Sequence, residues 1–383
     1  MGRVDWSEVP EDLLAAIARR FHTVIDYVNA ARVCKAWKSS TLSPHNLAIP
    51  STPPFLMLSE PKNEAVEVEN FRGFAEFRSN NRGTTKVCDL YLPEIHQSRC
   101  IGSTGNWLIL INLDLQIYIF NPFTKNQVHF PSQSTLPDQY YEGYEEDDEE
   151  NPFTNALLGD FFITKAFLSS PDSKGIIAMV IYGLKKNVAI ARPGDQSWTP
   201  ITHIAASDDV IFFRGKFHSV HSDGVIVAFH IDEIDISNPA LQIVALLKNL
   251  SLGKHYLVEW SGRLLIVTRL FINQENNQFY ETNGFKLQLY DIDKRECTEI
   301  KHLGHHSLFL GFNTSVSLSA SDDSPFERNC IYFTEDCIQV KNMESGHDMG
   351  VFHLDDGTIK PLYDGVSTSH CSPPVWIIPK SIC

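Results

Sequence analysis

From residue 55 to the C-terminal end, the sequence is a succession of short apolar runs separated by turn residues. The runs are roughly four to eight residues long and rich in Ile, Val, Phe and Tyr, which is typical of strands. About two dozen of them can be counted, which is too many for an ordinary β-sandwich. A closed ring of four-stranded blades covers the edges of that many strands. The sequence therefore predicts a β-propeller of about six blades, with seven as the alternative.

A weak internal repeat agrees with blades of this kind. An apolar strand followed by a turn rich in Asn, Asp, Pro or Gly recurs at residues 117–124, 188–195, 287–294 and 349–357. We interpret each instance as the inner half of a blade, in which a further strand follows the tight turn. The spacing is irregular, at roughly 45 to 70 residues, whereas a regular kelch array repeats about every 50. The predicted repeat is therefore kelch-like but irregular.

The N-terminal part of the chain has a helical pattern instead. Four apolar residues recur there at the spacing of one helix face, namely Leu13, Leu14, Ile17 and Phe21. Pro10 suits the first turn of this helix, because its missing N–H would have no partner at that position. Asp26 is a candidate cap for a second helix, and a third short helix is expected over residues 33–38.

A Pro-rich segment separates the helical pattern from the strand pattern. Ser43-Pro44 and residues 50–54 (Pro-Ser-Thr-Pro-Pro) stop helix formation and favour a stiff linker. The predicted fold class is therefore α + all-β. It comprises a three-helix domain over residues 1–45, a Pro-rich linker over 46–54 and a β-propeller over 55–383.

Charge and cysteine content disfavour several classes of protein. The net charge of −15 has the wrong sign for bulk attraction to phosphate backbones, so no nucleic-acid partner is expected. No apolar run approaches the 18 or so residues that span a bilayer, so no membrane association is expected either. The eight cysteines include no Cys-x-x-Cys pair, and we expect no disulfides. An intracellular, soluble protein of the cytoplasm, the nucleus or both is predicted.

No arrangement of residues typical of catalysis or cofactor binding stands out. The sequence has no P-loop, no dinucleotide-binding glycine motif, no His-Glu-x-x-His and no Gly-x-Ser-x-Gly elbow. His302, His305 and His306 form the most metal-like local group, but Gly304 interrupts it. We interpret these three residues as satisfied or surface histidines. No catalytic residue, cofactor or metal is predicted.

The remaining polar and thiol features also have ordinary explanations. Cys330 and Cys337 flank a strand-like run and are interpreted as core residues. The aspartate pairs at 322–323 and 355–356 are interpreted as turn residues. Residues 140–150 carry a dense acidic run, which we expect to be an exposed loop, with binding to a basic partner as the alternative.

The most informative motif lies at the N-terminus. It consists of Val9-Pro10-Glu11-Asp12-Leu13-Leu14, then Ile17, then residues 32–38 (Arg-Val-Cys-Lys-Ala-Trp-Lys). In order, spacing and residue type this pattern resembles the F-box over roughly 40 residues, with Val9 in place of the usual Leu. The resemblance implies contact with a Skp-type adaptor through Val9, Pro10, Leu13, Leu14, Ile17, Val33, Cys34 and Trp37.

The size of this N-terminal module agrees with a role in binding. A three-helix module this short cannot bury all of its large apolar side chains by itself. The surplus apolar surface would mark a partner site, laid into a groove as an amphipathic helix would be. The alternative is that these side chains only cover the β-domain.

Three later segments also have a family resemblance. They are residues 191–198, residues 256–267, and residues 303–311 together with 329–334. They resemble the β-propeller domain of plant KIB-type F-box proteins, a family with kelch-like repeats. The most specific part is Leu-Gly-His-His-Ser-Leu-Phe-Leu-Gly followed by Asn-Cys-Ile-Tyr-Phe. Trp260 and Cys297 depart from the family pattern, which leaves the fold prediction intact but leaves open whether the partner surface is the same.

Together the two resemblances imply a function. They imply the substrate-recognition subunit of an SCF-type E3 ubiquitin ligase, which reaches cullin and RING subunits through the Skp-type adaptor. The propeller would bind a target protein that the sequence does not identify, and the chain itself would not be an enzyme. The alternatives are a propeller scaffold outside any ligase and a propeller hydrolase with carboxylates around its central channel.

Overall fold

The computed structural model describes most of the chain. The described residues are 6–21, 26, 30, 33–41, 54–59, 71–76, 86–137, 162–169, 175–201, 204–230, 240–247, 253–273, 280–292, 294–322, 324–336, 348–362 and 374–378. Strands dominate these residues, as the pattern of short apolar runs predicts. None of the described helices is long and apolar enough to cross a membrane.

The helical elements lie at the N-terminus. They are the 3-10 helix η1 (Trp6–Glu8) and the α-helices α1 (Glu11–Ala18) and α3 (Lys35–Thr41). Helix α1 begins directly after Pro10, whose carbonyl accepts hydrogen bonds from the N–H groups of Leu13 (3.1 Å) and Leu14 (3.0 Å). The predicted second helix lies largely outside the described residues. Only Asp26 and Ala30 of that helix are described. Two α-helices are therefore described, and a three-helix domain is not confirmed.

Three sheets each consist of four antiparallel strands that are consecutive in the sequence. The first is β4 (Arg99–Thr104), β5 (Trp107–Ile111), β6 (Ile117–Phe120) and β7 (Gln127–His129). The second is β8 (Ile163–Leu168), β9 (Ala178–Tyr182), β10 (Asn187–Ala191) and β11 (Thr199–Pro200). The third is β12 (Ser207–Phe213), β13 (Lys216–His221), β14 (Val225–His230) and β15 (Ala240–Leu246). The 3-10 helices η2 (Pro93–Ile95) and η3 (Gln133–Thr135) lie beside the first sheet in the sequence.

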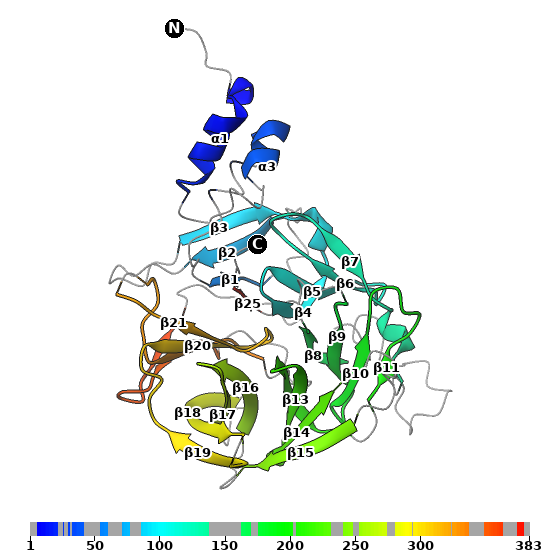
Figure 1. Cartoon of the computed structure of the whole chain (residues 1–383), viewed down its shortest axis with the longest axis vertical. Coiled ribbons are helices and arrows are strands. Elements are labelled where there is room, and N and C mark those ends of the chain that lie inside the picture. Colours follow the sequence, from blue (N-terminus) through cyan, green and yellow to red (C-terminus); the bar gives the residue numbers. More distant parts are fainter. Residues whose placement is uncertain are drawn as a thin grey trace.

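A fourth sheet joins the two ends of the β-rich region. It combines β1 (Phe55–Met57), β2 (Phe71–Glu76) and β3 (Lys86–Tyr91) with β25 (Val375–Ile377), in the order β25-β1-β2-β3. Strands β1 and β25 are antiparallel, with Phe55 opposite Ile377. The sheets follow one another around a ring, and this shared sheet closes it (Figure 1). Helices α1 and α3 lie outside the ring, beyond β3 (Figure 1).

The fifth sheet is larger and less regular. Its nine strands are β16 (Gly253–Trp260), β17 (Arg263–Asn273), β18 (Tyr280–Asp291), β19 (Glu296–Ile300), β20 (His306–Leu310), β21 (Val316–Ser319), β22 (Cys330–Phe333), β23 (Gly350–His353) and β24 (Ile359–Pro361). Strands β16 and β21 meet at one pair, Glu259 with Val316, and β20 runs parallel to β22. The described strands thus form a propeller-like fold, but they are not simply six equal blades. A regular kelch repeat is not shown.

The repeat seen in the sequence falls on the outer half of each sheet. Its four instances coincide with β6, β10, β18 and β23, and each precedes the outermost strand of its sheet. The prediction that they form inner halves is therefore wrong. The inner strands β12 and β16 end instead in two-residue turns, Arg214-Gly215 and Ser261-Gly262, that lead to the second strand of the same sheet.

The apolar core lies between neighbouring sheets. One buried cluster joins Ile119 of β6 to Val180 of β9, and it includes Trp198, which precedes β11. The inner strands β4 and β8 approach very closely at Gly102, where an added Cβ would lie 2.2 Å from the carbonyl oxygen of Ala166. At the ring closure, the indole N–H of Trp376 donates to the carbonyl of Leu310 at 3.1 Å.

Candidate functional site

The N-terminal helices form a small core of their own. Leu14 is fully buried and Trp37 is 7% exposed, and both pack against Ala30. Val9, Ile17, Phe21 and Cys34 surround this centre and are partly buried. Among the described residues, no strand contributes to this cluster. Within the part of the chain that the structure describes, these side chains therefore pack inside the helical module and not on a strand.

Hydrogen bonds hold the two helices in register. The indole N–H of Trp37 donates to the carbonyl of Trp6 at 2.7 Å. The hydroxyl of Ser40 donates to the carbonyl of Glu11 at 3.3 Å, which links α3 to the start of α1. Trp37 thus connects η1 and α3 through a polar contact as well as through burial, because a buried indole N–H needs an acceptor.

Several apolar residues of the same module remain open to solvent. Leu13 is 52% exposed and Val33 is 51% exposed, although both are large aliphatic residues. Trp6 and Pro10 are exposed as well. We call Trp6, Pro10, Leu13 and Val33 the exposed apolar set. A contiguous patch of exposed apolar side chains is typical of a partner site.

The eight residues predicted for adaptor contact are thus in one module but not in one environment. Leu14 and Trp37 fill its interior. Val9, Ile17 and Cys34 are half-buried, and Pro10, Leu13 and Val33 are exposed. The sequence pattern could not separate these groups, because buried and exposed residues of the module are both apolar.

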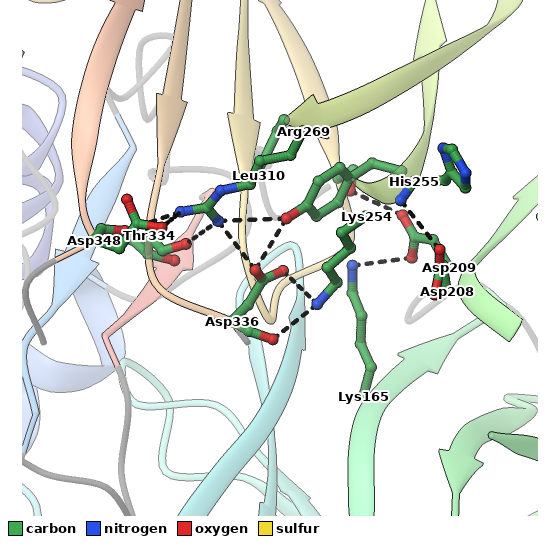
Figure 2. Close-up of polar contacts among 12 residues, drawn as sticks. Lys165, Asp208, Asp209, Lys254, His255, Arg269, Leu310, Thr334, Asp336 and Asp348 are labelled. Carbon is green, nitrogen blue, oxygen red and sulfur yellow. Dashed lines mark hydrogen bonds and ion pairs between the residues drawn. The ribbon is translucent and has the colours of Figure 1, made fainter. Parts of the chain in front are cut away.

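A second group of residues was not found from the sequence, and it lies inside the β-rich ring. Arg269 of β17 pairs through Nη1 with Oδ1 of Asp336 at 3.1 Å and through Nη2 with Oδ2 of Asp348 at 2.9 Å (Figure 2). Lys254 of β16 also pairs with Asp336, at 2.9 Å. Arg269 donates further to the carbonyl of Thr334 at 2.9 Å. These contacts join the β16–β17 hairpin to the connection between β22 and β23.

A neighbouring ion pair joins two inner strands. Lys165 of β8 lies 2.9 Å from Oδ1 of Asp209 of β12, and both side chains are buried (Figure 2). Asp209 also accepts hydrogen bonds from the N–H of Leu257 (3.0 Å) and the hydroxyl of Ser315 (3.1 Å). One carboxylate therefore connects three different strands or loops of the ring.

The protonation of these groups follows from burial and from their partners. Burial lowers the pKa of the Lys165 ammonium and raises the pKa of the Asp209 carboxyl, while their mutual attraction opposes both shifts. Burial alone would also raise the pKa of Asp336. The cations Lys254 and Arg269 outweigh it, so the pKa of Asp336 lies below its ordinary value.

This arrangement is suited to holding strands together rather than to acid–base chemistry. Asp209 and Asp336 are buried, and each is engaged by at least one cation. The signal in the sequence was an isolated charge within an apolar run, as at Lys165 in Ile-Thr-Lys-Ala-Phe-Leu and at Arg269 in Val-Thr-Arg-Leu-Phe. Lys and Arg are rarely fully buried unless they are paired, so such a position predicts a buried partner without identifying it.

The other groups noted in the sequence have the following positions. Cys330 is buried, as predicted for a core thiol, and Cys337 lies outside the described residues. Asp356 accepts hydrogen bonds from the N–H (2.9 Å) and hydroxyl (2.7 Å) of Thr358, which is the turn chemistry expected of it. His302 is exposed and lies 3.7 Å from Asp355. The acidic run 140–150 lies outside the described residues.

Comparison with known proteins agrees with both parts of the chain. A family model described as KIB1-4 beta-propeller matches residues 76–353. The probable F-box protein At4g22165 of Arabidopsis thaliana is 23% identical over 369 residues, covering 94% of this chain and 92% of the relative. The putative F-box protein At3g25750 is 24% identical, covering 97% of both chains. F-box protein SKIP23 of the same plant is 25% identical over 416 residues, covering 98% of this chain and 96% of its own.

Proposed function

The chain belongs to the KIB1-4 β-propeller family, and from this premise we propose that it is the substrate-recognition subunit of an SCF-type E3 ubiquitin ligase. The N-terminal residues 1–45 bind a Skp-type adaptor, which connects the chain to cullin and RING subunits. The linker over residues 46–54 leads to the propeller over 55–383, which binds a target protein. The complex works in the cytoplasm, the nucleus or both.

The observation that carries this proposal is the exposed apolar set on the helical module. Leu13 and Val33 belong to the part of the sequence that resembles the F-box, and about half of each is open to solvent. The interior of the module is already filled by Leu14 and Trp37, so the exposed side chains have no role in that core. Curated relatives that cover nearly the whole chain are named F-box proteins, which supports the same reading.

The propeller has the properties of a rigid platform. In this proposal it has six blades, with β16–β19 forming one and β20 with β22–β24 forming another. The buried ion pairs of Arg269 and Lys165 hold neighbouring parts of the ring in place. A rigid platform keeps a bound target near the E2 enzyme and so raises its effective concentration, with no bond chemistry in this chain.

The test is adaptor binding by the full chain. Replacing both Leu13 and Val33 with Ala removes exposed apolar contact area and leaves Leu14 and Trp37 in place. We expect the affinity for a Skp-type adaptor to fall by about 2 kcal/mol, or roughly thirtyfold. Leu184→Ala is the control, because Leu184 is an even more exposed leucine, at 70%, in the turn between β9 and β10 of the propeller. Wild-type affinity of the double variant would contradict the assignment.

Two further measurements separate this function from its alternatives. A scaffold that never joins a ligase would not bring down cullin, and deleting residues 1–45 would make no difference to its complexes. A propeller hydrolase would turn over a substrate in a broad screen. Replacing one carboxylate residue of the central channel would abolish that activity. The pairing of Asp209 and Asp336 with cations favours the non-catalytic function.

A further inference from the structure

Three potential metal ligands meet at one end of the β22–β23 hairpin. Cys330 and His353 are directly opposite each other in this antiparallel pair. The Cys330 Sγ lies 3.4 Å from Nδ1 of His353, and this nitrogen lies 3.6 Å from Oε2 of Glu327. All three ligand atoms lie within 4.8 Å of one another. Among the described residues, this is the one group of three such side chains that close together.

The spacing of these atoms matches one face of a tetrahedron. Zinc binds thiolate sulfur at about 2.3 Å, imidazole nitrogen at about 2.0 Å and carboxylate oxygen at about 2.1 Å. At tetrahedral angles, these bond lengths place neighbouring ligand atoms roughly 3.4 to 3.6 Å apart. The distances from Nδ1 of His353 to Cys330 and to Glu327 therefore need little adjustment to admit an ion.

The electrostatic surroundings favour a cation. Burial, together with the nearby carboxylates of Glu327, Asp355 and Asp356, raises the pKa of the Cys330 thiol to about 12. The same carboxylates that disfavour a thiolate attract a divalent cation, and a coordinated metal ion deprotonates its thiol ligand. Lys360 is the cation that opposes this field.

The backbone around the group holds it in place. The N–H of Cys330 donates to the hydroxyl of Ser307 at 3.1 Å, and that hydroxyl donates to the carbonyl of Glu327 at 2.5 Å. The N–H of His353 donates to the carbonyl of Thr358 at 2.9 Å. Two ligands thus come from paired strands and the third from the turn that precedes β22. A site on paired strands loses little entropy when it binds an ion.

We propose that Glu327, Cys330 and His353 form a zinc-binding site with three protein ligands and a water molecule in the fourth position. The ion joins the turn before β22 to the end of β23 and so stabilises this hairpin. No local pattern in the sequence indicates this site, since the ligands are at positions 327, 330 and 353 and the nearby histidine cluster supplies none of them. The site is independent of the ubiquitin-ligase proposal.

The experiment measures Zn²⁺ binding to the metal-free full chain by titration calorimetry, with Co²⁺ as a spectroscopic probe of thiolate ligation. We expect one tight site per chain and a Co²⁺ spectrum with a thiolate-to-metal band. Glu327→Gln and His353→Gln should each weaken Zn²⁺ binding about tenfold or more. Cys330→Ser should abolish the thiolate band. Glu327 is exposed, so Glu327→Gln keeps the test valid if a change at buried Cys330 prevents folding.

Two controls separate this site from surface binding. His302→Ala removes an exposed neighbouring histidine and should leave the affinity unchanged. Cys297→Ser removes a different thiol that is in no disulfide and should leave the Co²⁺ band unchanged. The proposal is overturned if the full chain binds no Zn²⁺ at one equivalent, or if folded Glu327→Gln and His353→Gln bind it as the unmodified chain does.

Discussion

Arg269 and Asp336 are 67 residues apart in the sequence and form a buried ion pair, with Nη1 and Oδ1 separated by 3.1 Å. Asp336 also forms an ion pair with Lys254, and Arg269 also forms one with Asp348. The hydroxyl of Tyr256 donates to Asp336 at 2.9 Å. This small network ties the β16–β17 hairpin to the β22–β23 connection, on the side of the ring where the strand pairing is least regular.

Replacing Arg269 with Met should destabilise the propeller severely. The change leaves Asp336 and Asp348 without this cation, and removing one partner of a buried pair costs about 3 to 5 kcal/mol. The free energy of unfolding in urea measures the effect. Lys294→Ala is the control, because its pair with Asp291 is exposed and should contribute less than about 1 kcal/mol. Equal losses in the two variants would show that burial of the Arg269 pair is unimportant.

The pair of Lys165 with Asp209 should show strong coupling. We expect Lys165→Met to cost about 3 kcal/mol, because it leaves the Asp209 carboxylate buried without its cation. The double variant Lys165→Met, Asp209→Asn should recover part of this loss, since no uncompensated charge remains. A double-mutant cycle on unfolding free energies measures the coupling. Simple additivity of the two changes would mean that the ion pair is not formed.

The stability contributed by Asp336 should depend on pH. Its pKa in the folded protein is below the ordinary value of 3.8, so its contribution is fully present above that value. It is lost as the pH falls through the folded-state pKa. We expect the stability difference between the unmodified chain and Asp336→Asn to be constant near neutral pH and to shrink below about pH 4. A difference that grows on acidification would contradict the assigned direction.

Leu14→Ala should affect the helical module differently from Leu13→Ala. Leu14 is fully buried, so its truncation leaves a cavity and costs the module about 2 to 5 kcal/mol. Leu13 is half exposed, so its truncation should leave module stability within about 1 kcal/mol. Hydrogen exchange of the α1 amides in the full chain measures both effects. Equal protection in the two variants would contradict the burial of Leu14.

Gly102→Ala should separate the inner strands β4 and β8. The added Cβ would lie 2.2 Å from the carbonyl oxygen of Ala166, which is backbone and cannot rotate away. We expect a loss of about 2 kcal/mol or more, as for overpacking of a tight core. Gly284→Ala is the matched control, because its Cβ would have no neighbour closer than 3.8 Å. Thermal unfolding of both variants distinguishes a steric effect from a general effect of replacing glycine.

Much of the fold follows from local pattern. The runs around residues 107–111 and 263–271 are mostly apolar and include β-branched residues, and both form strands, because such side chains pack well in a buried sheet. The start of α1 was likewise predictable from Pro10, which suits the first turn of a helix, and from the dipole of the helix that follows it. Family membership also follows from the sequence, since specific segments such as 303–311 resemble the KIB-type propeller.

What the sequence could not decide is which residues share a neighbourhood. Nothing near Arg269 in the chain identifies Asp336 as its partner, and nothing near Cys330 identifies His353. The repeat predicts that β6 and β10 are strands, but it does not predict that they lie in the outer halves of their sheets. Leu13 and Leu14 are adjacent and chemically identical, yet one is buried and the other is exposed. Periodicity and composition are local properties, whereas burial and ion pairing depend on contacts between distant segments, and only the closed ring brings those together.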